Sequence, residues 1–223
     1  MRFPAFFFFT AAFLGIGFAG PRVEAGTHHS LSGSAVIREM NLARQHPDTY
    51  ADYIAQMRGH FRASIFSLPG GTLMRTHEGV GAIDEAVSFL RNARPLPPFV
   101  ASPGMSLAAA EHVRDQANGD FGHDGSDRSG PAERLNRHGS WSGRWGENIS
   151  YGKSSARDIV IALIVDDGQR ARKHRKNIFN EAFNYAGAAV GPHARYRTVC
   201  SIDFAGGYAE RGQVQSDPLF ARN

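Results

Sequence analysis

Four short segments of the chain carry acidic residues, and three of them also carry histidine. They are Glu111-His112, Gly122-His123-Asp124-Gly125, Gly146-Glu147-Asn148, and the stretch from Asp166-Asp167-Gly168 to His174. Imidazole and carboxylate groups that meet in one place suit a divalent cation such as Zn²⁺. The same groups suit proton transfer, because a carboxylate beside a histidine orients and tunes its ring. If the segments come together, the sequence therefore predicts a site for a metal, for a ligand or for acid–base chemistry.

The motifs of common hydrolases are missing. No serine has glycine at both −2 and +2, so the chain has no nucleophile elbow. The stretch His77-Glu78-Gly79-Val80-Gly81 begins like a zincin motif but lacks the second histidine. Cys200 lies in a predicted strand, on the same side as Ile202 and Phe204. This position predicts a buried, inert thiol. Catalysis would then depend on water activated by a metal or a carboxylate, and we lean against an enzyme.

Each candidate also has a structural interpretation. His112 taken alone is typical of a satisfied helix histidine, and Glu147 taken alone could bond nearby backbone amides. His174 lies in a basic run, residues 170–176, that is typical of a solvated surface. His123 is either an additional ligand or a residue that holds its own loop through its ring nitrogens, and we favour the second interpretation.

The elements that must position these residues are helices first and strands last. Apolar spacing predicts helices from Ser34, over 78–92, from Ser102-Pro103 through Val113, and over about 155–167. Residues 118–146, rich in Gly, Ser, Asp and Arg, predict a long ordered loop. Residues 197–205 alternate with period two and predict a strand. This order, without a regular βαβ pattern, indicates an α+β fold.

Residues 1–25 are typical of a secretory signal peptide. Arg2 precedes a charge-free apolar stretch over residues 5–19, and Val23 and Ala25 stand at the small-residue positions of a cleavage site. We expect cleavage, the alternative being an uncleaved anchor, and a secreted or periplasmic protein with no further membrane span. Loss of two arginines and one glutamate changes the net charge from +4 to +3. That mild excess does not indicate a nucleic-acid partner.

Taken in order and spacing, the four segments resemble the CAP superfamily of cysteine-rich secretory proteins, antigen 5 and pathogenesis-related 1 proteins, whose shared unit is the SCP domain. With Cys200 as its one cysteine, the chain is similar to the bacterial, disulfide-free type. The resemblance divides the chain into a signal peptide (1–25), a lead-in (26–33), a CAP domain (34–207) and a C-terminal tail (208–223). It implies a three-layer α-β-α sandwich with a central antiparallel sheet.

The resemblance also implies a cleft that holds two histidines and two acidic residues. His112 matches the helix histidine, Glu147 the glutamate of Gly-Glu-Asn, and His174 the second histidine. Asp166 stands where animal and plant members carry a second glutamate. Because aspartate is one methylene shorter, we expect either a narrower site or a site of three residues. His112 and His174 are the expected ligands of Zn²⁺ or another divalent cation.

The function implied by the resemblance is binding. We expect a secreted protein whose cleft takes a divalent metal, a small molecule, a lipid or a cell-wall ligand without catalysis. The alternative is a metal- or carboxylate-assisted extracellular hydrolase that acts on peptides or on the cell wall. A third possibility is a plain extracytoplasmic scaffold.

Overall fold

The computed structural model describes residues 31–67 and 73–212. The expected signal peptide, most of the lead-in and the end of the tail lie outside these ranges. In the part of the chain that is described, no helix combines the length and the apolar character needed to cross a bilayer.

A four-stranded sheet forms the centre of the molecule, in the order β4-β6-β7-β5. Its three long strands are antiparallel, and the two-residue strand β4 pairs with β6 in parallel. The expected antiparallel sheet is therefore confirmed for the long strands, with one short parallel addition. The bounds are Val100–Ala101 for β4, Gly139–Tyr151 for β5, Tyr185–His193 for β6 and Arg197–Glu210 for β7.

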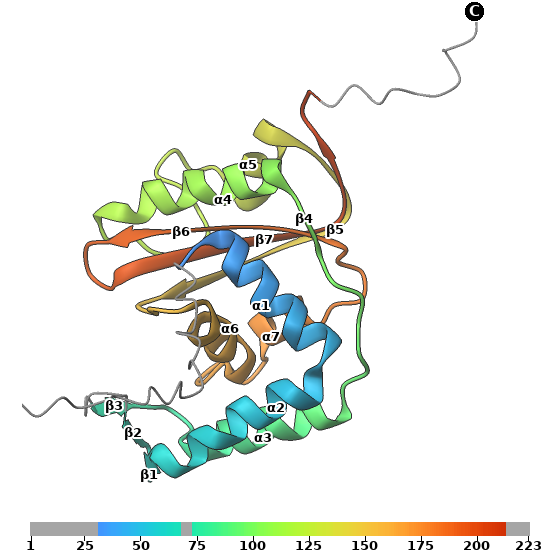
Figure 1. Ribbon diagram of the computed structural model, residues 1–223. Coiled ribbons are helices and arrows are strands. Elements are labelled where there is room, and N and C mark those ends of the chain that lie inside the picture. Colours follow the sequence, from blue (N-terminus) through green and yellow to red (C-terminus); the bar gives the residue numbers. More distant parts are fainter. Residues whose placement is uncertain (1–30, 68–72, 213–223) are drawn as a thin grey trace, which may run out of the picture.

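Helices cover both faces of this sheet, which confirms the expected sandwich (Figure 1). One face carries α4 (Pro103–Asp115) and α5 (Pro131–His138). The other carries α1 (Gly33–Gln45), α6 (Ala156–Val165) and α7 (Lys173–Ile178). Beyond that second layer lie α2 (Pro47–Ala55), α3 (Val80–Asn92) and a small sheet of β1 (Phe61–Arg62), β2 (Ile65–Ser67) and β3 (Leu73–Arg75).

Strand β7 divides the core, because successive side chains of a strand point to opposite faces. Cys200, Ile202 and Phe204 belong to the large apolar cluster on the α1 and α6 side. Val199 and Ala205 pack instead with α4 residues on the other face. Cys200 is a buried free cysteine, as expected.

Local capping signals explain where the predicted helices begin. Ser102 and Ser155 cap α4 and α6, and each side-chain oxygen accepts a hydrogen bond from a backbone N–H of the first turn. For α1 the cap is Ser32, two residues before the expected Ser34. All three starts lie close to the predicted positions.

The predicted loop over residues 118–146 is wrong in its second half. Pro131 begins α5, and the Glu133 carboxylate accepts a hydrogen bond from the Gly130 N–H at 2.7 Å. Strand β5 then starts at Gly139. The eight-residue α5 contains one large apolar residue, Leu135, and β5 begins with a stretch rich in Gly and Ser, so composition alone indicated a loop.

Candidate functional site

Glu147 is the centre of a buried polar group on the α4 side of the sheet. It lies directly opposite Asp203 across the β5–β7 pair, so both side chains point to the same face. Only 1% of the Glu147 side chain is exposed. Its carboxylate accepts hydrogen bonds from Arg134 Nη2 at 2.9 Å and Ser201 Oγ at 3.0 Å, and it lies 2.6 Å from His123 Nδ1. Side chains, and not the backbone amides considered from sequence, therefore hold this carboxylate.

His123 lies over Glu147 and faces solvent. Its side chain is 54% exposed, whereas its Nδ1 contacts the buried carboxylate. This hydrogen bond to Glu147 is the main reason that the pKa of His123 lies above its usual value. Among the described residues, Nε2 has no hydrogen-bond partner and is free to bind a ligand. Through Nδ1, His123 thus joins its loop to the Glu147 carboxylate of β5.

His112 supports that loop from below. The residue is fully buried on α4, and its Nε2 lies 2.9 Å from the Gly122 carbonyl oxygen. The Gln116 side-chain amide lies 3.0 Å from the same ring nitrogen and donates to the Gly122 carbonyl oxygen at 2.6 Å. Burial lowers the pKa of His112, which keeps the ring neutral. Its Nδ1 is buried without a partner among the described residues.

Asp203 is a buried acid that the sequence analysis did not single out. Neither carboxyl oxygen has a hydrogen-bond partner within the described ranges. Burial raises the pKa of Asp203 well above its usual value, and the charge of Glu147 adds to this effect. Ser201 and Asp203 alternate with the apolar residues of β7, and such polar positions in a central strand were the available signal.

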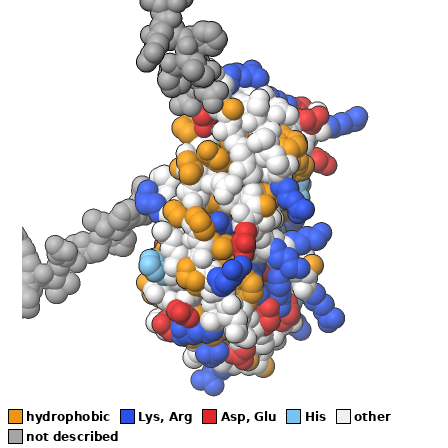
Figure 2. Space-filling view, turned by 90° about the vertical axis from the view of Figure 1, so that its right-hand side faces the viewer, with side chains coloured by type: hydrophobic (Ala, Val, Ile, Leu, Met, Phe, Trp, Pro, Cys, Tyr) orange, Lys and Arg blue, Asp and Glu red, His pale blue; other side chains and the backbone are white. Residues whose placement is uncertain are grey.

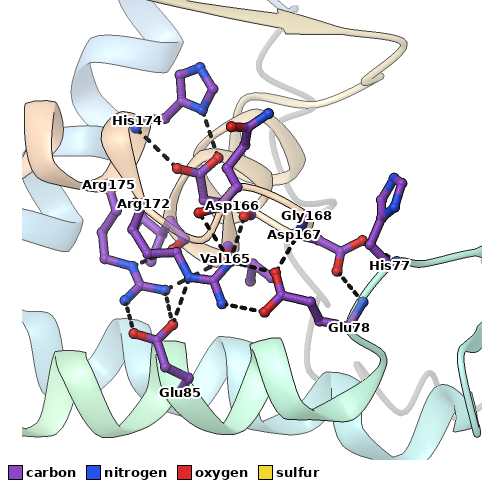
Figure 3. A network of polar contacts seen from close by, with 12 residues as sticks. His77, Glu78, Glu85, Val165, Asp166, Asp167, Gly168, Arg172, His174 and Arg175 are labelled. Carbon is purple, nitrogen blue, oxygen red and sulfur yellow. Dashed lines mark hydrogen bonds and ion pairs between the residues drawn. The ribbon is translucent and has the colours of Figure 1, made fainter.

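Asp166 and His174 form a second acid–histidine pair (Figure 3). Asp166 ends α6 with φ of 53°, a left-handed conformation that turns the chain toward α7. Its carboxylate accepts a hydrogen bond from the His174 backbone N–H at 3.1 Å and lies 2.7 Å from His174 Nδ1. The His174 side chain is 28% exposed and that of Asp166 only 4%. Here too a buried carboxylate contacts an imidazole, in this case one that is partly exposed.

The basic run beside His174 is only in part the solvated surface that the sequence indicated, because Arg170, Lys173 and Lys176 are exposed whereas Arg172 and Arg175 are engaged. Arg175 is 2% exposed and forms two hydrogen bonds of 2.6 Å with Glu85 of α3. Arg172 donates to both carboxylate oxygens of Glu78 at 2.7 Å and also to the Asp166 carbonyl oxygen. Figure 3 shows this network fastening the α6–α7 turn to the start of α3. The run therefore positions the turn that carries the Asp166–His174 pair.

The direct contacts join the candidate residues as His123–Glu147 and Asp166–His174. Within the described ranges, no hydrogen bond or ion pair links one pair to the other, or links His112 to Glu147. The pairs are neighbours through Asn148, whose amide donates to the His174 carbonyl oxygen at 3.0 Å. Over residues 31–67 and 73–212, no group of three or more His, Cys, Asp or Glu residues is arranged to hold a metal ion. The four-residue metal site stays a prediction.

The surface charge is mixed. Figure 2 shows acidic and basic side chains interspersed over one face, with small groups of apolar side chains between them. This distribution suits the mild net charge of +4.

Comparisons with known proteins place this geometry in context. The sequence profile of the cysteine-rich secretory protein family (CAP) matches residues 85–204, more than half of the chain. No curated protein matches the chain.

Three solved structures are similar to parts of the chain. An extracellular protein with an SCP domain from Bacillus anthracis has 21% identity and a TM-score of 0.41, over 56% of this chain and 40% of its own. A cysteine-rich secretory protein from Staphylococcus aureus has 14% identity and a TM-score of 0.39, over 57% of this chain and 38% of its own. An outer surface protein from Borrelia burgdorferi has 14% identity and a TM-score of 0.42, over 49% of this chain and 78% of its own. The chain thus spans about 40% of the length of the first two.

Proposed function

Because the chain belongs to the cysteine-rich secretory protein (CAP) family, we propose that it is an exported binding domain. In this proposal the exposed His123 and the partly exposed His174 bind a divalent cation or a small polar ligand, and the domain catalyses no reaction. The family and the expected signal peptide over residues 1–25 support export.

The observation that carries the proposal is the same arrangement found twice. Each ring has Nδ1 against a buried carboxylate, Glu147 or Asp166, and its Nε2 has no hydrogen-bond partner among the described residues. A carboxylate behind a histidine fixes the ring orientation and makes the other nitrogen a better ligand. Imidazole nitrogen favours Zn²⁺, Cu²⁺ and Ni²⁺ over Ca²⁺ or Mg²⁺.

His112 does not enter this proposal as a metal ligand. It is fully buried, and its Nε2 is engaged with the Gly122 carbonyl oxygen. Its role is to hold the loop on which His123 stands. At either ring, the imidazole would be the cation's one protein ligand among the described residues, and water or oxygen atoms of the ligand would fill the other positions.

Calorimetric titration of the metal-free protein with Zn²⁺ tests the proposal. We expect saturable binding that His123→Ala and His174→Ala each weaken and that the double variant abolishes. Glu147→Gln and Asp166→Asn should weaken binding by about 10-fold or more, since they remove the carboxylate behind each ring. Undiminished binding by the double variant would overturn the proposal.

His60 provides the matched control. It is an exposed histidine that contacts the Phe66 ring and has no carboxylate contact among the described residues. His60→Ala should bind Zn²⁺ like the unchanged protein. An equal loss in this variant would show that any surface histidine accounts for the signal.

A further inference from the structure

The exposed aromatic side chains of the described residues gather along one strand. Three large aromatic residues are substantially exposed, namely Phe121 at 45%, Trp145 at 40% and Tyr196 at 39%. Trp145, Glu147 and Tyr151 occupy alternating positions of β5 and share the face that carries α4 and α5. β5 is the edge strand of its sheet, and Trp145 and His123 are exposed on this side of it.

These rings lie in a row that follows the strand. Trp145 stands at one end, and His123 lies over Glu147 two positions further along. At the other end, the Phe121 ring lies 5.1 Å from that of Tyr151 and 5.2 Å from that of Tyr196. A strand rises about 3.3 Å per residue, so the row is roughly 20 Å long.

The far end of the row is held rigidly by the buried His193. Its Nδ1 accepts hydrogen bonds from the backbone N–H groups of Arg195 and Tyr196, so its Nε2 carries the proton. That Nε2 donates to the Asp120 carbonyl oxygen at 3.0 Å, next to Phe121. Two loops that are distant in sequence are thereby fixed side by side, which lowers the entropic cost of binding.

The side chains of the row indicate which class of ligand it can bind: a lipid, a protein, a nucleic acid or a sugar. Phe121, Tyr151 and Tyr196 contact one another, but the polar His123 lies between them and Trp145, so the rings do not form one continuous apolar surface of the kind that a lipid or protein interface favours. The exposed carboxylates of Asp120 and Asp124 flank Phe121 and His123, and the exposed Arg195 guanidinium lies 5.6 Å from the centre of the Phe121 ring and 5.5 Å from that of Tyr196. Charges of both signs therefore line the row, which matches neither a polyanion such as a nucleic acid nor a polycation. Carboxylates do accept hydrogen bonds from hydroxyl groups, and the C–H faces of sugar rings pack on aromatic rings.

We propose that this row, made of Trp145, His123, Phe121 and Tyr196, binds an uncharged polysaccharide chain along β5. Several sugar rings in succession match its length, with the outer rings of the ligand stacked on Trp145 and on Phe121 with Tyr196. Hydroxyl groups between them face His123 and the acidic loop. This binding does not depend on a metal, so it and the metal proposal can fail separately.

The test uses chitin and cellulose oligosaccharides of increasing length, added to the full protein in the presence of EDTA. Calorimetry and tryptophan fluorescence report binding, since Trp145 is one of two tryptophans in the chain. We expect saturable binding to at least one series, with longer chains at least about 10-fold tighter than the disaccharide. Trp145→Ala and the double variant Phe121→Ala/Tyr196→Ala should each weaken binding about 10-fold or more, which is ~1.4 kcal/mol.

Conservative and unrelated variants complete the design. Trp145→Phe should retain most of the affinity, because a ring remains at the position. Leu107→Ala removes an apolar side chain, 54% exposed on α4, that lies outside the row, and should bind like the unchanged protein. The absence of binding to both series, equal binding by Trp145→Ala, or tighter binding of an oligothymidylate probe would overturn the proposal. His174→Ala should leave oligosaccharide binding intact while it weakens Zn²⁺ binding.

Discussion

At the scale of single residues, a buried carboxylate determines how each exposed histidine behaves. Glu147 and Asp166 are almost fully withdrawn from solvent, and each contacts Nδ1 of an imidazole whose other edge is accessible. The partner of Glu147 is His123, 24 residues before it in the chain, and not the helix histidine His112. Cys200 shows the opposite case, because burial alone raises the pKa of its thiol and leaves it unreactive.

Glu147→Gln should lower the pKa of His123 toward about 6.5, its value in an unstructured chain. The carboxylate raises that pKa in the folded protein, so protonation of His123 stabilises the fold. The stabilisation is complete below the unfolded-state pKa and is lost as the pH rises through the folded-state value. NMR titration of the ring and urea unfolding at several pH values measure both effects.

Asp124→Asn is the control for this prediction. Asp124 is exposed, and its charge raises the pKa of His123 less than Glu147 does. We expect a smaller shift in this variant. A His123 pKa that does not respond to Glu147→Gln would contradict the hydrogen bond.

At the scale of elements, glycines set how closely the helices approach β6. A Cβ atom at Gly187 would lie 2.3 Å from the backbone of Met105 and Ser106 in α4. A Cβ atom at Gly33 of α1 would lie 1.8 Å from the Ala188 carbonyl oxygen. The two helix layers therefore press on β6 from opposite faces at adjacent residues, and larger side chains there would separate the layers.

Gly187→Ala should destabilise the protein by about 3 kcal/mol, because the new methyl group meets backbone atoms that cannot move aside alone. Urea unfolding followed by circular dichroism measures the change. Gly81→Ala is the matched control, since a Cβ atom at this exposed α3 position has no neighbour within 4 Å. It should be stabilising by about 0.5 kcal/mol. Equal stability of the two variants would show that α4 can shift freely.

At the scale of the whole molecule, Arg44 connects segments that are far apart in sequence. It is 2% exposed and donates to the carbonyl oxygens of Pro97 at 2.8 Å and Ile178 at 2.7 Å. Further hydrogen bonds reach Asn180 and Phe183, and the guanidinium lies 4.0 Å from the centre of the Phe99 ring. Burial lowers the pKa of Arg44 to about 10, so it remains charged at neutral pH. One side chain thus fastens α1 to the connector before β4 and to the segment before β6.

Arg44→Met should cost about 3 kcal/mol of unfolding free energy, because buried carbonyl groups lose their donor. The exposed Arg38→Met on the same helix should change stability by less than about 0.5 kcal/mol. Thermal and urea unfolding of both variants measure the difference. A small effect at Arg44 would mean that water replaces the lost hydrogen bonds.

The amino-acid sequence by itself determined the α+β class, the starts of α4 and α6, the buried strand with Cys200, and the residue types of the candidate site. These features depend on periodicity, caps and motifs, which are properties of neighbouring residues. The tertiary structure alone decided that His123 contacts Glu147, that Asp203 lies opposite that glutamate, and that Arg172 and Arg175 are paired with α3. It also decided that exposed rings from three segments share one strand face. Such pairings depend on the register of the strands and on how loops pack against the sheet. The paired residues are far apart in the sequence, so local sequence patterns do not predict their contacts.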